Sequence, residues 1–285
     1  MVESRVSLAL GGGAAKGLAH VGVLRGLEED GIEVAAVAGT SMGSIVGALL
    51  SRGMAAREME AFFSAVDWSR LGRIMVRSPG GAAFSDLLRE TIGEVSIEEL
   101  ELPFAAVCCD LDDGEEVVLG TGDLADAVRA SSAIPGILPP LVVDGRTLVD
   151  GALVTPVPVA AAERLADASV LAVNVLRPPK PGQLGKRMMN RLFEGSAPAQ
   201  LLEGVDTILK RHRIRLWRRK AKFPGRFEVM MQSFHIMQYN LSKLCASDLY
   251  AVEPEVGEVG WFDFHLAREI MAEGYRAYRE STIHE

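Results

Sequence analysis

The chain has 285 residues, of which 48% are hydrophobic and 24% are charged, and it carries a formal net charge of −8. This length and composition suit a soluble globular protein that buries a substantial core. The three cysteines, Cys108, Cys109 and Cys245, exclude a disulfide framework and show no metal-binding spacing. We therefore expect a reducing, cytoplasmic setting and no bound metal.

Two apolar stretches resemble, in part, a transmembrane segment and a signal peptide. The uncharged span from Val34 to Ser51 approaches membrane-spanning length, but its central GTSMGS is typical of a buried strand, turn and helix. The run VSLALGGGAA after Arg5 is short, follows Glu3 and contains three successive glycines, which argues against a signal peptide. We expect neither a transmembrane segment nor a cleaved leader.

In the first 178 residues, short apolar runs alternate with helical patterns. Strands are predicted at 6–10, 34–38, 104–109, 116–119, 147–149 and 170–175, and helices at 16–30, 44–50, 56–65, 85–93, 124–130 and 157–165. This alternation predicts an α/β fold, a three-layer sandwich with a mainly parallel central sheet. In such sheets the working site lies at the carboxyl ends of the strands.

A proline-rich break at 178–182 ends the alternation. We therefore predict a catalytic core over 1–178 and a helical C-terminal extension over 179–285 packed on it, with helices near 198–220, 229–246 and 263–279. Net charge changes at the same point, from −12 over residues 1–179 to +4 over 180–285. The region around Gly80 and Gly81 and residues 180–197 are candidates for mobile covers.

The most informative motif is Gly39-Thr40-Ser41-Met42-Gly43, which lies between a predicted strand and a predicted helix. A serine at such a turn is the nucleophile elbow of acyl hydrolases. The first N–H groups of the helix that follows are free to face an oxygen that becomes negative. The alternative is that Ser41 only caps the helix.

A glycine-rich run, GGGAAKG at 11–17, directly follows the first strand and opens a helix. Glycines there let a substrate approach backbone N–H groups, which is what an oxyanion hole requires. A phosphate-binding loop is the alternative. The run fails the P-loop pattern because Gly17 follows Lys16, and it also fails the G-x-G-x-x-G pattern.

The general base is harder to find from the residues. The late histidines are His212, His235, His265 and His284, and none follows a strand in a glycine-rich context. Asp150 does, because it ends the short strand at 147–149 and precedes Gly151 and Ala152. On its own, such an aspartate also suits a turn or a helix cap.

Taken together, these motifs resemble the patatin-like phospholipase family over roughly residues 5–176. The similarity rests on GGGAAKG, GTSMG and Asp150-Gly151-Ala152, and it extends through the stretch ASSAIPG at 130–136 and LPP at 138–140. The segment from Asp263-Phe264 to Tyr275 also resembles the end of bacterial members. The chain departs from the family at Ala14, where a further glycine is frequent, and at Lys16, where arginine is commoner.

The resemblance implies a serine acyl hydrolase of phospholipase A or lysophospholipase type that uses a Ser41–Asp150 dyad without histidine or cofactor. The oxyanion hole would be formed by Gly12, Gly13, Ala14 and Met42, with Gly12 shaping the turn. Supporting positions would be Lys16, Gly17, Gly39, Gly43 and Gly151. The alternatives are a soluble carboxylesterase, thioesterase or acyltransferase with the same dyad, or an idle lipid-binding scaffold.

A basic segment indicates a second kind of partner. Residues 186–226 hold twelve Lys and Arg and only three acidic residues, with apolar side chains between them. This composition favours peripheral contact with an anionic membrane. The candidate contact residues are Arg213, Arg215, Trp217, Arg218 and Arg219. A solvated basic helix docked on the core is the alternative, and no nucleic-acid partner is expected.

Overall fold

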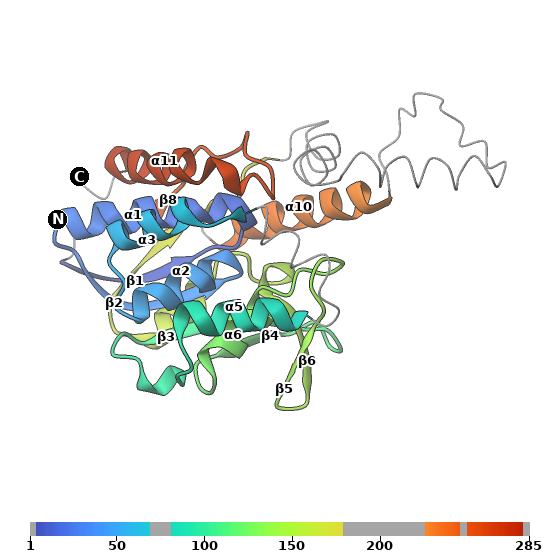
Figure 1. Ribbon diagram of the computed structural model, residues 1–285. Coiled ribbons are helices and arrows are strands. Elements are labelled where there is room, and N and C mark those ends of the chain that lie inside the picture. The colour runs from blue at the N-terminus through green and yellow to red at the C-terminus, as the bar shows by residue number, and fades with distance from the viewer. Residues whose placement is uncertain (1–3, 69–80, 179–225, 246–249, 282–285) are drawn as a thin grey trace, which may run out of the picture.

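The computed structural model describes residues 4–68, 81–178, 226–245 and 250–281, and Figure 1 shows a central sheet with helices around it. The strand order is β5-β6-β3-β2-β1-β7-β8, with β4 also paired to β3. The parallel strands are β1 (Arg5–Leu10), β2 (Glu33–Thr40), β3 (Phe104–Asp110), β7 (Ser169–Val173) and β8 (Tyr250–Val252). The antiparallel ones are β4 (Glu116–Leu119), β5 (Leu141–Val143) and β6 (Arg146–Asp150).

Helices cover the two faces of the sheet, which gives three layers. They are α1 (Ala19–Glu29), α2 (Met42–Ser51), α3 (Ala56–Ala65), α5 (Ala82–Ile92), α6 (Leu124–Ser131), α7 (Val159–Leu165), α10 (Arg226–Cys245) and α11 (Ala267–Glu280). Alternate residues of β1 explain the layering. Leu8 and Leu10 belong to the large core formed with α1, α2 and α11, whereas Ala9 packs in the smaller cluster with α7.

Helices α1 and α11 approach each other closely through glycine. A Cβ added at Gly22 would lie 1.9 Å from the carbonyl oxygen of Met271, and one at Gly274 would lie 1.9 Å from that of Ala19. Because backbone atoms cannot yield as a side chain does, both positions require glycine. The C-terminal helix is therefore tightly packed on the N-terminal one, as Figure 1 shows.

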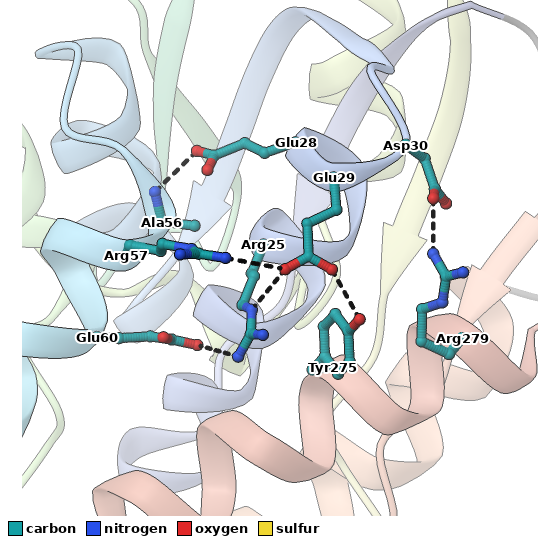
Figure 2. A network of polar contacts seen from close by, with 9 residues as sticks. All are labelled: Arg25, Glu28, Glu29, Asp30, Ala56, Arg57, Glu60, Tyr275 and Arg279. Carbon is teal, nitrogen blue, oxygen red and sulfur yellow. Dashed lines mark hydrogen bonds and ion pairs between the residues drawn. The ribbon is translucent and has the colours of Figure 1, made fainter.

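A polar network ties α1 to α3 and α11 at the molecular surface (Figure 2). The carboxylate of Glu29 pairs with Arg25 at 2.9 Å and accepts a hydrogen bond from the Tyr275 hydroxyl at 2.7 Å. One residue further on, Asp30 pairs with Arg279 at 2.6 Å. The hydrogen bonds from Tyr275 and Arg25 lower the pKa of Glu29, the Tyr275 bond most of all. The network therefore favours the ionised form of the Glu29 carboxylate.

The predicted α/β class and mainly parallel sheet are confirmed. The description of the chain after residue 178 as chiefly helical was incomplete, because β8 pairs in parallel with β7 and extends the core sheet. A three-residue strand is too short to show a period in the sequence. The predicted helix at 198–220 and the candidate cover at 180–197 lie outside the described residues. Within the described ranges, no helix is both long enough and apolar enough to span a membrane.

Candidate active site

Ser41 lies on the tight turn between β2 and α2. Its backbone has φ 54° and ψ −121°, which for a residue with a side chain costs about 1–3 kcal/mol and is typical of functional sites. The backbone approaches both flanking positions too closely for a side chain. A Cβ at Gly43 would lie 2.0 Å from the Leu10 carbonyl oxygen, and a Cβ at Gly39 would lie 2.4 Å from the Gly43 carbonyl oxygen. Both flanking glycines are therefore required where the sequence predicted them.

Asp150 ends β6 and meets Ser41 from 109 residues away. The Ser41 hydroxyl donates a hydrogen bond of 2.7 Å to Asp150 Oδ2, and the Ala152 N–H donates one of 2.9 Å to Oδ1. Both side chains are buried, with exposed fractions of 5% for Ser41 and 3% for Asp150. Burial raises the pKa of Asp150 to about 6, against the two hydrogen bonds that lower it. This carboxylate therefore has a higher proton affinity than an exposed one.

Gly151 lets β6 end directly beside β3. A Cβ there would lie 2.2 Å from the Val107 carbonyl oxygen, so no larger residue fits after Asp150. The 3₁₀ turn Gly151–Leu153 then begins with Asp150 as its cap. Asp150 therefore makes both of the contacts that the sequence left as alternatives. It accepts a hydrogen bond from Ser41, and it caps the turn that follows.

Ser131, at the end of α6, holds the backbone of Ser41. The Ser41 N–H donates to Ser131 Oγ at 2.9 Å, and the Ser131 hydroxyl donates to the Val107 carbonyl at 2.6 Å. Val107 lies on β3, beside the Thr40 that precedes Ser41. The strained turn is therefore fixed to the sheet through one buried hydroxyl.

The glycine loop at 11–17 lies against this pair. A Cβ at Gly12 would lie 3.4 Å from Ser41 Cβ and 3.1 Å from Ala152 Cβ. The Gly12 N–H donates to the Pro156 carbonyl at 2.8 Å, so Gly12 shapes the loop and does not offer a donor. The N–H groups of Gly13, Ala14 and Met42 have no hydrogen-bond partner among the described residues. These three predicted donors therefore stay available.

Ala14 has φ 48°, in the left-handed region that favours glycine. Position 14 therefore has a backbone conformation that suits glycine, and the alanine found there is strained. Gly17 lies close to Met42, since a Cβ at Gly17 would be 2.5 Å from Met42 Cγ. The loop and the elbow therefore pack directly on each other.

Two buried basic residues support the loop from α1 and the turn before it. His20 is fully buried, and its Nε2–H donates to the Gly11 carbonyl at 2.7 Å. Burial lowers its pKa to about 4, so it is neutral at physiological pH. Lys16 is 3% exposed, and burial together with the nearby charge of Arg177 lowers its pKa to about 8. The Lys16 side chain is thus buried and does not extend into solvent.

The remaining candidates fall elsewhere. His235 is buried on α10 and contacts Arg177 and Trp261, and no contact of His265 with Ser41 or Asp150 is present among the described residues. His212, His284 and the five membrane-surface candidates lie outside the described residues. No group of three or more His, Cys, Asp and Glu in the described ranges could hold a metal ion.

Comparisons with known proteins identify the family of this chain. The sequence profile of the patatin-like phospholipase family matches residues 8–163, so the chain belongs to that family. An uncharacterized NTE family protein of Mycobacterium bovis is 39% identical over 162 residues, covering 55% of this chain and 45% of that protein. Lysophospholipase NTE1 of Mycosarcoma maydis is 36% identical over 182 residues, covering 60% of this chain and 10% of that protein. The chain thus corresponds to less than half of either relative.

A solved structure shows the same fold. VipD from Legionella pneumophila superposes with a TM-score of 0.51 at 13% sequence identity, covering 98% of this chain and 66% of that one. At this identity the likeness concerns the arrangement of helices and strands alone. It includes the C-terminal part of the chain, beyond the family profile.

Sequence reasoning missed three residues that contact the site. Ser131 lies in the ASSAIPG stretch, which was noted only as part of the resemblance and without a role. His20 lies near the start of α1, four residues after Lys16, which belongs to the preceding 3₁₀ turn. Trp261 gave no local signal, because it reaches the glycine loop from the far end of the chain.

Proposed function

We propose that this protein is a serine acyl hydrolase of phospholipase A or lysophospholipase type, with Ser41 as nucleophile and Asp150 as general base. The observation that carries the proposal is the buried hydrogen bond of 2.7 Å between Ser41 Oγ and Asp150 Oδ2. Family membership supports an acyl lipid as substrate, and one relative carries the name lysophospholipase.

The proposed reaction has two steps. Asp150 accepts the Ser41 proton while Oγ attacks the ester carbonyl, and the proton then passes to the departing alcohol, which leaves an acyl-enzyme. Asp150 next takes a proton from water, and the resulting hydroxide equivalent releases the fatty acid and restores Ser41. A pKa of about 6 supports the role, since a base works best when its pKa lies near the working pH.

The oxyanion is assigned to the N–H groups of Gly13, Ala14 and Met42. These N–H groups have no other hydrogen-bond partner in the described part of the chain, which supports the assignment. Helix α2 begins at Met42, and the dipole of a helix favours negative charge at its first residues. Such donors act mainly on the transition state, where the loss of one typically costs about a hundredfold to a thousandfold in rate.

The test is product analysis with phospholipids, lysophospholipids and short p-nitrophenyl esters. We expect fatty acid release from lipids by the wild type and loss of about 10⁴-fold in Ser41→Ala. Ser51→Ala is the matched control, because Ser51 is a buried serine at the far end of α2, the helix that Ser41 precedes. Cleavage of short soluble esters alone would favour a soluble esterase. Equal activity of Ser41→Ala and wild type would refute the proposal.

A further inference from the structure

The glycine loop is held from both sides by groups outside it. The Gly12 N–H is bound by Pro156, and three residues later the Ala15 N–H donates to the Trp261 carbonyl at 3.1 Å. Between these anchors lie Gly13 and Ala14, whose N–H groups are the proposed oxyanion donors. Since Ala14 has a positive φ, the loop needs external contacts to keep this conformation.

Trp261 is fixed by its side chain as well as bound through its backbone. The residue is 7% exposed and belongs to one hydrophobic cluster with Ala14, Ile134 and Met231. Its indole N–H donates to His235 Nδ1 at 3.3 Å. The same residue thus shares a hydrophobic cluster with Ala14 of the loop and accepts a backbone hydrogen bond from Ala15.

His235 connects Trp261 to the segment after β7. It is 6% exposed, and its Nε2 lies 2.9 Å from the Arg177 carbonyl. Because a carbonyl only accepts, the Nε2 carries the proton, and Nδ1 is free to accept from the indole. Helix α10, which carries His235, also lies against the 3₁₀ turn that follows Asp150. The C-terminal part of the chain therefore contacts both halves of the site.

We propose that Trp261 and His235, which lie beyond the segment matched by the family profile, are positioning residues that hold the oxyanion loop in its working conformation. The inference rests on the proposed function of Ser41 and the loop. On this inference, the C-terminal part of the chain contributes to stabilisation of the transition state. Loss of the indole–imidazole bond should then lower kcat and leave KM nearly unchanged, since loop position acts on the oxyanion.

The test is steady-state hydrolysis of p-nitrophenyl butyrate by Trp261→Phe, which keeps the aromatic ring and the backbone carbonyl. We expect kcat to fall about tenfold, with KM within about twofold of wild type. Trp68→Phe is the matched control, because it removes an indole bond of 3.2 Å to the Phe63 carbonyl and leaves a ring that stacks on Phe264. The control should keep wild-type kcat.

A double-mutant cycle with His235→Phe separates a shared role from general damage. If the two residues act through one bond, the double variant should have the kcat of the more damaged single variant, and the individual losses should not multiply. Unchanged kcat in Trp261→Phe, a change in KM alone, or losses equal to those of Trp68→Phe would overturn the inference. Full activity of Ser41→Ala in the same assay would instead refute the proposed function.

Discussion

Two regions of this molecule hold carboxylates in opposite ways. At the α1–α3–α11 surface, Glu29 and Asp30 face partners of opposite charge and remain open to water (Figure 2). At the carboxyl edge of the sheet, Asp150 is buried, has no cationic partner among the described residues and receives only a hydroxyl and one N–H. The first arrangement lowers the pKa of Glu29, and the second raises that of Asp150 to about 6.

The difference shows which carboxylate of this fold can accept a proton near neutral pH. An ionised, well-paired surface carboxylate has little tendency to accept a proton, and exposed ion pairs contribute little to stability. A desolvated carboxylate accepts a proton readily, and the folded protein loses stability when it is ionised. The proposed role of Asp150 as a base therefore conflicts with stability, whereas Glu29 has no such conflict.

The largest effect is expected for Asp150→Asn. The amide cannot accept the Ser41 proton, so kcat should fall by about 10⁴-fold in an ester hydrolysis assay. Asp144→Asn is the matched control, because Asp144 lies on the turn between β5 and β6 with φ 49°, which asparagine tolerates. Activity of Asp150→Asn within tenfold of wild type would contradict the assignment of the base.

The same substitution should stabilise the protein in a pH-dependent way. Because the folded-state pKa of Asp150 is raised from 3.8 to about 6, its contribution to stability is fully present below pH 3.8 and is lost as pH rises through 6. Asp150→Asn should therefore gain up to about 3 kcal/mol at pH 8 and little at pH 4, measured by urea unfolding. An equal gain at both pH values would argue against this cause.

The pH dependence of the wild-type rate tests the same pKa without a mutation. We expect kcat/KM to fall about tenfold for each pH unit below about 6, since Asp150 must be ionised to accept the Ser41 proton. Far-ultraviolet circular dichroism at each pH shows that the protein stays folded. A rate that is constant down to pH 4.5 would mean that no buried carboxylate acts as base.

A smaller effect is expected for Ser131→Ala. Loss of the hydroxyl leaves the Ser41 N–H and the Val107 carbonyl unpaired, so kcat should fall about tenfold and stability by about 1–2 kcal/mol. Ser132→Ala is the matched control, because the buried Ser132 hydroxyl has no partner in the described part of the chain. Equal kinetics for the two variants would remove Ser131 from the positioning scheme.

The smallest effect is expected in the surface network. Glu29→Gln removes the charge that pairs with Arg25 and weakens the bond from Tyr275, yet kcat should stay within about twofold of wild type. The melting temperature should change only slightly, and less at about 1 M salt, where exposed pairs are screened. A large loss of activity would show that the two regions are coupled.

Much of the fold followed from local patterns. The helix at 56–65 and the strand at 116–119 were predicted with their observed bounds, the helix from apolar residues at helical spacing and the strand from its short apolar run. Strands β5 and β8 were not predicted, since each has three residues. Strand β8 pairs with the distant β7, which no local period reveals, whereas β5 forms a tight hairpin with the neighbouring β6.

The site divides in the same manner. Ser41, Asp150 and the glycine loop are marked by short motifs that a turn or close approach requires, so the sequence could indicate them. The bond from Ala15 to Trp261 and the bond from Ser41 to Ser131 join residues far apart in the chain. The raised pKa of Asp150 depends on burial from several elements. Such properties exist only once the chain has folded.

The central claim is that Ser41 is a nucleophile activated by Asp150. Labelling with a fluorophosphonate, followed by mass spectrometry of the intact protein and its peptides, tests it most directly. We expect one adduct on Ser41 in the wild type and in Asp144→Asn, and a labelling rate reduced by several orders of magnitude in Asp150→Asn. An unlabelled Ser41, or undiminished labelling in Asp150→Asn, would contradict the account.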